Sequence, residues 1–211
     1  MPHPKLRRLR RSNLPVDTLS LARFLIGKFI VHDLPSGRLS GRIVEAEAYP
    51  PGDPAGHHFR GPTPRIRSMY QAPGHAYVYF NYGAHFMLNV SSEPKGQAGG
   101  ILIRAVDPLD GIEIMQRHRK TKNLLDLTRG PGRLAAAFKI NRQQDGLDLC
   151  APGALWLAEL LPAPPPLPVG VTTRIGLSRA AHQPFRFYEI GNPFVSGPKR
   201  LLSSTPKKQN S

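Results

Sequence analysis

An apolar stretch in the first quarter of the chain carries two carboxylates at the spacing of a strand. Residues 43–49 read Ile-Val-Glu-Ala-Glu-Ala-Tyr, and a period of two places Glu45, Glu47 and Tyr49 on one face. Two carboxylates among small apolar neighbours suit general acid–base chemistry. The alternative is an exposed strand edge with two solvated glutamates, because charged side chains are mostly exposed. Alternation by itself does not choose between Glu45 and Glu47.

An aromatic segment further along the chain predicts a β-hairpin. Residues 77–81 (Tyr-Val-Tyr-Phe-Asn) alternate as a strand does, and residues 86–90 form a second, mostly apolar strand. Gly83 suits the turn between them because glycine accepts a positive φ without steric cost. Tyr82 then lies at the tip. A large ring at a turn has no core to fill, so it either packs on a neighbouring loop or inserts into a partner such as a stack of bases.

Residues 50–76 have no regular period and predict a long loop, which in a compact domain is usually functional or disordered. Arginines close to large side chains suit phosphate contacts combined with a wedge between stacked bases. The loop contains such a group: Arg60, Arg65, Arg67, Met69 and Tyr70.

The histidines and the single cysteine do not predict a metal site. His57 with His58, and His75 with His85, lack the spacing of a helical ligand pair, and no acidic residue lies close to them. Cys150 is the only cysteine, which excludes an internal disulfide and any cysteine-cluster site.

Three further arginines are placed to meet negative charge. Arg104 lies inside the apolar segment 100–106, where it needs a carboxylate partner if buried, or else faces outward from an edge. Arg133 follows the segment Gly-Pro-Gly, which leads into a helix predicted over residues 134–140. The backbone amides at the start of such a helix can bind a phosphate. Taken alone this is only a helix N-terminus. Arg142 comes just after the helix.

The charge of the chain favours a polyanionic partner. The 211 residues carry a formal net charge of +15, with five basic side chains in residues 1–13 and four in residues 197–211. Because an excess of positive charge remains between these tails, nucleic acid is the first candidate and an acidic membrane surface the second. The alternative is that the charge serves solubility alone. No apolar run is long enough to span a membrane, and no signal region follows the start.

The elements that position these residues follow from period, caps and turns. We expect a flexible basic arm over residues 1–13, one domain over residues 14–201 and a disordered tail over residues 202–211. Asp17 is expected to cap a helix that runs to Lys28, Asp110 is expected to cap a helix over 112–120, and residues 121–127 are expected to form a connector. The further strands are expected over residues 29–32, 41–49, 154–159, 171–175 and 186–190.

Read together, these segments resemble the alkyladenine (3-methyladenine) DNA glycosylase family from Asp17 to Ser196. Several independent motifs in one order carry the resemblance: Arg-Ile-Val-Glu-Ala-Glu-Ala-Tyr at 42–49, Thr-Pro-Arg at 63–65, Tyr-Val-Tyr-Phe-Asn-Tyr-Gly at 77–83, Asn-Val-Ser-Ser at 89–92, Leu-Ile-Arg at 102–104, Gly-Pro-Gly-Arg-Leu at 130–134, Arg-Ile-Gly at 174–176 and Pro-Phe-Arg-Phe-Tyr at 184–188. Ala84 departs from the family, where a larger side chain such as Met is common.

The resemblance implies roles for individual residues. Glu47 is implied as the catalytic carboxylate, with Arg104 holding the water and the carboxylate, and Tyr82 as the side chain that fills the gap left by a flipped nucleotide. The implied base pocket consists of Tyr49, His57, Tyr79, Asn89 and Ile175. The implied DNA contacts are Arg65, Met69, Arg133 and Arg142.

The resemblance also implies the fold and the activity. The expected fold is mixed α/β (α+β), a single domain around a curved antiparallel sheet with surrounding helices and a protruding hairpin that enters the minor groove. The expected enzyme is a monofunctional hydrolase that flips 3-methyladenine, 7-methylguanine, hypoxanthine or ethenoadenine out of duplex DNA. A glutamate-activated water then breaks the N-glycosidic bond and leaves an abasic site.

The expected partner is double-stranded DNA containing damaged purines, with no membrane and no cofactor, and the expected state is a monomer. The expected location is the nucleoid-containing cytoplasm of a bacterium, or the nucleus of a eukaryote. Two other function classes remain open from the sequence. A non-catalytic basic module would bind nucleic acid through the hairpin aromatics, and a nuclease would need clustered acidic metal ligands, of which the chain offers little beyond Glu45 and Glu47.

Overall fold

A large antiparallel sheet organises the protein. The computed structural model describes residues 5–81 and 83–198. All strand pairs within this part are antiparallel, and the sheet is open, with the order β1-β7-β2-β3-β6-β5-β4 and with β9 joining β3 to β8. The strands are β1 (Lys5–Arg8), β2 (Phe29–Leu34), β3 (Gly37–Tyr49), β4 (Ala76–Asn81), β5 (His85–Ser91), β6 (Gly100–Asp110), β7 (Leu155–Leu161), β8 (Val169–Thr172) and β9 (Arg186–Glu189).

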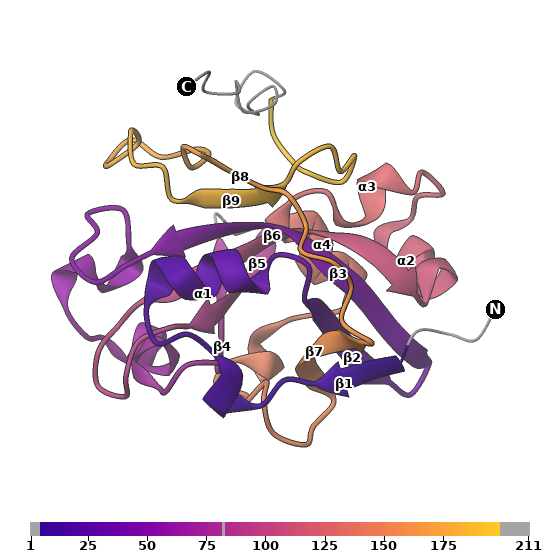
Figure 1. Ribbon diagram of the computed structural model, residues 1–211, viewed down its shortest axis with the longest axis horizontal. Coiled ribbons are helices and arrows are strands. Elements are labelled where there is room, and N and C mark those ends of the chain that lie inside the picture. The colour runs from indigo at the N-terminus through magenta and orange to yellow at the C-terminus, as the bar shows by residue number, and fades with distance from the viewer. Residues whose placement is uncertain (1–4, 82, 199–211) are drawn as a thin grey trace.

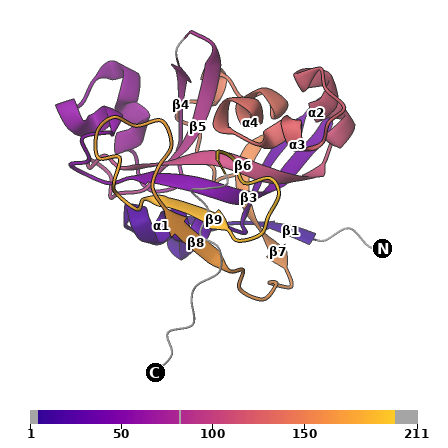
Figure 2. The same cartoon turned by 90° about the horizontal axis from the view of Figure 1, so that it is seen from above.

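Helices cover the sheet from two sides. Helix α1 lies on one side, whereas α2 to α4 lie on the other, next to the projecting β4–β5 hairpin (Figures 1 and 2). The α-helices are α1 (Thr18–Leu25), α2 (Ile112–Arg119), α3 (Leu125–Thr128) and α4 (Pro131–Ala137). The 3₁₀ helices are η1 (Arg11–Asn13), η2 (His57–Arg60), η3 (Pro64–Tyr70) and η4 (Arg142–Gln144). This arrangement confirms the predicted α+β class with one antiparallel sheet.

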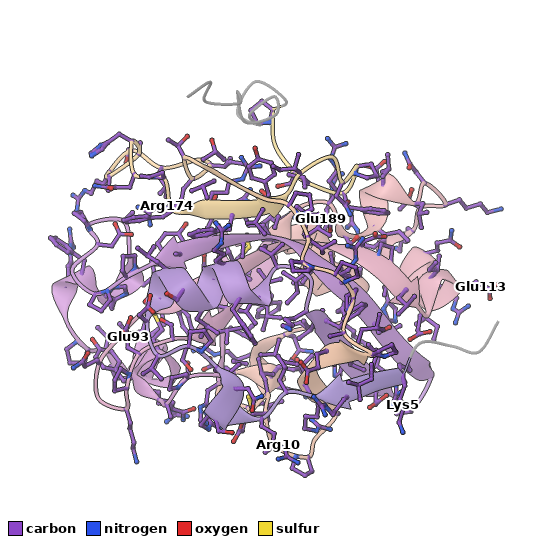
Figure 3. The ribbon with its side chains drawn as sticks, in the orientation of Figure 1. Lys5, Arg10, Glu93, Glu113, Arg174 and Glu189 are labelled. Atoms are coloured by element: carbon purple, nitrogen blue, oxygen red, sulfur yellow. The ribbon has the colours of Figure 1, made fainter. Side chains whose placement is uncertain are left out.

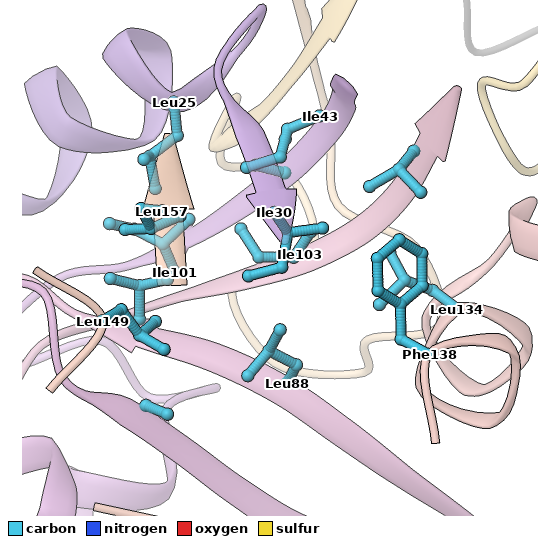
Figure 4. Packing of buried hydrophobic residues seen from close by; sticks show 14 of the residues in the cluster. Leu25, Ile30, Ile43, Leu88, Ile101, Ile103, Leu134, Phe138, Leu149 and Leu157 are labelled. Atoms are coloured by element: carbon cyan, nitrogen blue, oxygen red, sulfur yellow. The ribbon is translucent and has the colours of Figure 1, made fainter. Parts of the chain in front are cut away.

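The main apolar core fills the space inside the curved sheet. Leu25 of α1 and Leu134 of α4 reach it from different helices and belong to one cluster with Ile103 of β6 and Leu157 of β7 (Figure 4). Burying such side chains stabilises the fold by about 1.5–3 kcal/mol each. The core therefore joins the helices to the sheet and gives the strands of the sheet a fixed position.

A bulge in the β3–β6 pair separates the apolar core from the two glutamates. The register pairs Ile43 with Val106 and Ala46 with Ile103, and it leaves one extra residue on each strand, Val44 and Arg104. Ile43 and Ala46 both face the main core although they are three positions apart. The bulge thus shifts the alternation, and the residues after it present their polar side chains away from the core.

The prediction of a flexible basic arm over residues 1–13 is wrong for the described residues 5–13. Lys5–Arg8 form β1, which pairs with β7, and Leu9 behind it is fully buried. The ring of Trp156 lies 4.4 Å from the Arg8 guanidinium, a cation–π distance. Two apolar residues lie among the basic ones of this segment: Leu6 packs beside the cluster of Phe29, Val31 and Trp156, and Leu9 belongs to the main core. Residues 1–4 and the tail predicted to be disordered over 202–211 lie outside the described residues.

The cap predictions have mixed outcomes. Asp17 caps α1 as predicted, because its side chain accepts the Ser20 amide at 2.8 Å. Asp110 does not cap α2: the capping position is Gly111, whose positive φ of 75° suits glycine. The carboxylate of Asp110 instead accepts the Ser40 hydroxyl at 2.6 Å. The connector predicted over residues 121–127 contains the start of α3.

The hairpin is confirmed, and its outer strand is covered by side chains. Gly83 has a positive φ of 65°, as the turn requires. Strand β4 is an edge of the sheet, so its outward backbone groups need partners. The Val78 amide donates to Asp145 at 2.9 Å, and the carbonyls of Val78 and Phe80 accept from two arginines. This cover stabilises the edge strand and prevents other chains from pairing with it.

The cover on β4 leads to a prediction about stability. Oδ1 of Asp145 accepts both the Val78 amide and the Ser68 hydroxyl, at 2.9 and 2.7 Å. Asp145→Ala should lower the free energy of unfolding by about 1–3 kcal/mol, because it removes the side-chain acceptor of the Val78 edge amide. Urea unfolding measures this loss. Gln143→Ala, an exposed change nearby, is the control, and an equal loss in both variants would contradict the prediction.

Candidate active site

A cavity of about 340 Å³ opens between the β-sheet, the loop with η2 and η3, and the segment before β9. Its walls bring together residues that are far apart in the sequence. Those that were singled out from the sequence and now line one cavity are Glu47, Tyr49, His57, Met69, Tyr79, Asn89, Arg104 and Ile175. The arginines expected to contact DNA do not line it.

Glu47 is the acidic residue of the cavity wall. It is fully buried in β3, and its Oε1 accepts the backbone amide of Ile175 at 2.8 Å. Its Oε2 accepts the Tyr49 hydroxyl at 3.0 Å and lies 3.2 Å from Nη1 of Arg104. Three donors therefore hold one carboxylate in a defined orientation at the cavity, which is the arrangement a positioned base requires.

Glu45 has a different environment although it shares a face with Glu47. It does not line the cavity, and both of its oxygens are occupied by structural partners. Oε1 accepts from Arg104 at 3.1 Å and from Arg186 at 2.7 Å, and Oε2 accepts the Ser196 amide at 2.6 Å. The alternative that both glutamates form a solvated edge is wrong, because both are fully buried.

Arg104 connects the two glutamates. Its guanidinium is within ion-pair distance of Glu45 and Glu47, and its side chain is nearly buried. Burial by itself lowers the pKa of this group, but the charges of Glu47 and Glu45 outweigh that effect and raise the pKa above its usual value. The alternative of an edge-facing arginine is therefore wrong, and Arg104 is a permanent cation beside the Glu47 carboxylate.

Tyr49 forms a wall of the cavity next to Glu47. Burial raises the pKa of its phenol, and the Glu47 carboxylate raises it further, so the hydroxyl stays a neutral donor. Behind the ring, the Arg174 guanidinium lies 4.6 Å from the ring centroid. Arg174 forms a buried ion pair with Asp53 and donates to the Ala48 carbonyl, and Figure 3 shows it and Glu189 near opposite ends of β9.

A second aromatic wall consists of His57, Tyr77 and Tyr79. The ring centroids of His57 and Tyr79 are 4.5 Å apart at an interplanar angle of 78°, while Tyr77 stacks on Tyr79. Nδ1 of His57 lies 2.9 Å from the Tyr77 hydroxyl. Burial lowers the pKa of His57 and the nearby charge of Arg65 lowers it further, so the ring is neutral near neutral pH. Neighbouring His58 is turned to the Pro50 carbonyl instead.

Asn89 and Met69 complete the wall. Asn89 is buried between β4 and β6, and its amide donates to the Tyr77 carbonyl at 3.1 Å. Met69, expected to contact DNA, is 3% exposed, packs with Ile66, Tyr77 and Ala98 and lines the cavity. Its contact with DNA stays a prediction.

The remaining DNA-contact candidates lie around the cavity rather than in it. Arg65 and Arg142 donate to the edge carbonyls of Phe80 and Val78, at 3.1 and 3.0 Å. Arg133 forms an exposed ion pair with Asp126. Tyr82, predicted at the hairpin tip, lies outside the described residues.

Some residues of the site had no role assigned from the sequence, although Arg174 and Arg186 lie within the motifs at 174–176 and 184–188. Arg186 and Ser196 hold Glu45, and the Asp53–Arg174 pair supports Tyr49. These contacts join segments more than a hundred positions apart, so spacing along the chain does not reveal them. Within residues 5–81 and 83–198, no three His, Cys, Asp or Glu side chains cluster as a metal site requires. Every helix of that part is too short or too polar to cross a bilayer.

The cavity combines one fixed carboxylate, a permanent cation and two aromatic walls. Such a site can hold a flat, electron-poor ring by stacking and can activate a water molecule beside it.

Comparison with known proteins agrees with this chemistry. The family model of methylpurine-DNA glycosylases matches residues 12–193. Three bacterial relatives bear the name "Putative 3-methyladenine DNA glycosylase". That of Mesorhizobium japonicum is 58% identical over 94% of this chain and 93% of its own. Those of Paraburkholderia phytofirmans and Chlorobaculum tepidum are 53% and 41% identical, over 95% and 97% of both chains. The chain therefore belongs to the methylpurine-DNA glycosylase family.

Proposed function

We propose that this enzyme removes alkylated and deaminated purines from duplex DNA by hydrolysis of the N-glycosidic bond. The observation that carries the proposal is the Glu47 carboxylate, which three donors hold at the wall of a cavity with aromatic sides. A module that only binds nucleic acid has no use for a buried carboxylate in such a place. The expected substrates are 3-methyladenine, 7-methylguanine, hypoxanthine and ethenoadenine.

The damaged base is taken out of the stack and enters between the two aromatic walls. The rings of His57 and Tyr79 touch each other, so no base fits between them. The proposed slot lies between this pair and Tyr49. Extrusion costs a few kcal/mol and least for damaged pairs, and stacking on aromatic faces returns about 1–3 kcal/mol per base.

Glu47 then acts as the general base. A water molecule attacks the sugar C1′, its proton passes to the Glu47 carboxylate, and the C1′–N bond breaks with its electron pair going to the purine. An alkylated purine is electron-poor and leaves readily, so neither a covalent lysine nor a metal is needed. Arg104 orients the carboxylate, and the negative charge of Glu47 stabilises the positive charge that develops on the sugar.

We propose that the hairpin and the basic residues around it bind the DNA. Tyr82 would fill the gap left by the flipped nucleotide, and Arg65, Arg133 and Arg142 would bind phosphates. The enzyme is proposed to act as a monomer. Because the named relatives are bacterial, the expected place of action is the nucleoid in the cytoplasm.

Substitutions of the two glutamates, which have different environments, test the mechanism. Glu47→Gln should slow single-turnover base release by about 10²–10⁴-fold, because the amide keeps the shape but cannot accept the proton of water. Binding to lesion DNA should survive. Glu45→Gln should instead lower the free energy of unfolding, because it leaves Arg104 and Arg186 short of a buried counter-charge.

Single-turnover excision and urea unfolding of both variants separate these effects. If Glu45→Gln leaves stability unchanged and abolishes excision more completely than Glu47→Gln, the assignment is wrong.

Asn89 gives a test of base selectivity. Guanine carries a 2-amino group on its minor-groove edge that adenine and hypoxanthine lack, and stacking cannot detect it. We propose that the Asn89 side chain, held by the Tyr77 carbonyl, collides with this amine. Asn89→Ala should raise excision of guanine, and of mispaired guanine most, relative to hypoxanthine in the same sequence. Single-turnover release from the three duplexes measures the ratio, and an unchanged ratio would move selectivity to the flipping step.

A further inference from the structure

A basic surface extends from the end of α2 to the start of α4. Between residues 117 and 133 one side chain is acidic, Asp126, and six are basic: Arg117, Arg119, Lys120, Lys122, Arg129 and Arg133. Arg117, Lys120 and Lys122 are exposed around a shallow hollow at the end of α2, which also includes Glu113. The basic side chains of this segment therefore outnumber the acidic side chains that could neutralise them.

Two arginines within this surface compete for one acidic residue. Nη1 of Arg133 donates to Oδ1 of Asp126 at 2.6 Å, and Oδ2 of the same carboxylate accepts from Asn123 at 2.9 Å. Arg119 reaches only the Asp126 backbone carbonyl, at a long 3.4 Å. Its Nε is buried and has no partner among the described residues. Within the part of the chain that the structure describes, Arg119 is thus a cation without a carboxylate partner.

The charges of Arg119 and Arg133 act on each other. Burial lowers the pKa of Arg119, and the neighbouring Arg133 cation lowers it further, while Asp126 compensates only in part. A second anion between the two guanidinium groups would relieve this repulsion. A phosphate has the oxygens to accept from both arginines at once.

The basic surface is continuous with the hairpin. Helix α4 packs closely on β5, because a Cβ at Gly132 would lie 2.9 Å from the Cβ of His85. Figure 2 shows α2, α3, α4 and the β4–β5 hairpin on the same side of the sheet, opposite α1. Figure 3 labels Glu113 in the first turn of α2, and the basic residues follow at the other end of this short helix. A duplex that lies across the hairpin and α4 therefore meets the end of α2 next.

We propose that Arg119 and Arg133 together bind one phosphate of the DNA backbone, and that Lys120 and Lys122 bind further phosphates along the duplex. In the free protein the Asp126 carboxylate occupies Arg133 and not Arg119, and DNA binding exchanges it for a phosphate that accepts from both arginines. The exchange is easy because an exposed ion pair contributes little to stability. This inference rests on the proposed function only in that its ligand is duplex DNA.

The test measures how affinity for an undamaged duplex depends on salt. The duplex extends beyond the hairpin on both sides. Each phosphate contact adds about 0.9 to the slope of log affinity against log salt. Arg119→Gln should lower the slope by about 0.9, whereas Arg119→Lys should largely keep it, which separates charge from shape. Arg23→Gln is the matched control, because this exposed arginine lies on α1, on the other side of the sheet.

Two further variants test the exchange and the extent of the surface. Asp126→Asn should tighten binding, because the competing carboxylate is gone. Lys120→Gln with Lys122→Gln should lower the slope on the long duplex and leave it unchanged on one that ends beside α4. Equal slopes for wild type, Arg119→Gln and Arg23→Gln would overturn the proposal, as would weaker binding by Asp126→Asn. If Arg119→Gln does not fold, the Asp126 and lysine variants decide.

Excision of hypoxanthine is measured separately at saturating enzyme. Normal excision with unchanged slopes would reject this surface and keep the proposed function. The predicted slopes without any excision by the wild type would keep the surface and reject the proposed function.

Discussion

The buried group of two glutamates and two arginines is the interaction on which the site depends. Glu45, Glu47, Arg104 and Arg186 are together nearly removed from water, which is costly for each charge unless all are paired. Glu45 accepts from both arginines and from the Ser196 amide, and thereby joins β3, β6, β9 and the segment after β9. Arg104 donates to Glu45 through Nε, and its Nη1 lies next to the Glu47 carboxylate. The orientation of the cavity carboxylate thus depends on a neighbour that does not line the cavity.

The bulge in the β3–β6 pair makes this group compatible with an apolar core. Without it, the alternation that puts Leu39 and Ile43 into the core would carry Glu45 and Glu47 there as well. The extra residues Val44 and Arg104 shift the side-chain alternation by one position on each strand, and the pairing register is restored after them. Charges and core can then occupy opposite faces of the same two strands.

The rim of the cavity has a second constraint, the exposed edge of β4. Backbone groups of an edge strand must be paired or covered, and here Arg65, Arg142 and Asp145 cover them. Arg65 and Arg142, which are expected to bind phosphates, therefore donate hydrogen bonds to backbone carbonyls of the hairpin in the free protein. The same contacts fix the wall that carries Tyr77 and Tyr79, so the edge of the sheet and the aromatic side of the pocket are stabilised together.

The features that depend on near neighbours can be predicted from the amino-acid sequence. Strand alternation placed Glu45, Glu47 and Tyr49 on one face, glycine chemistry placed the hairpin turn, and Asp17 was correctly assigned as a cap, because each depends on a few adjacent residues. Family motifs selected the residues that line the cavity.

Alternation leaves the two glutamates equivalent, and the choice of Glu47 from the sequence rests on the family resemblance alone. The tertiary structure distinguishes them physically, because Arg186 and Ser196, which lie far along the chain, hold Glu45. It also turned the basic segment Lys5–Arg8 into an edge strand and buried Met69. In both cases apolar contacts with distant strands and loops outweighed the local pattern, and the free energy of such contacts cannot be read from spacing.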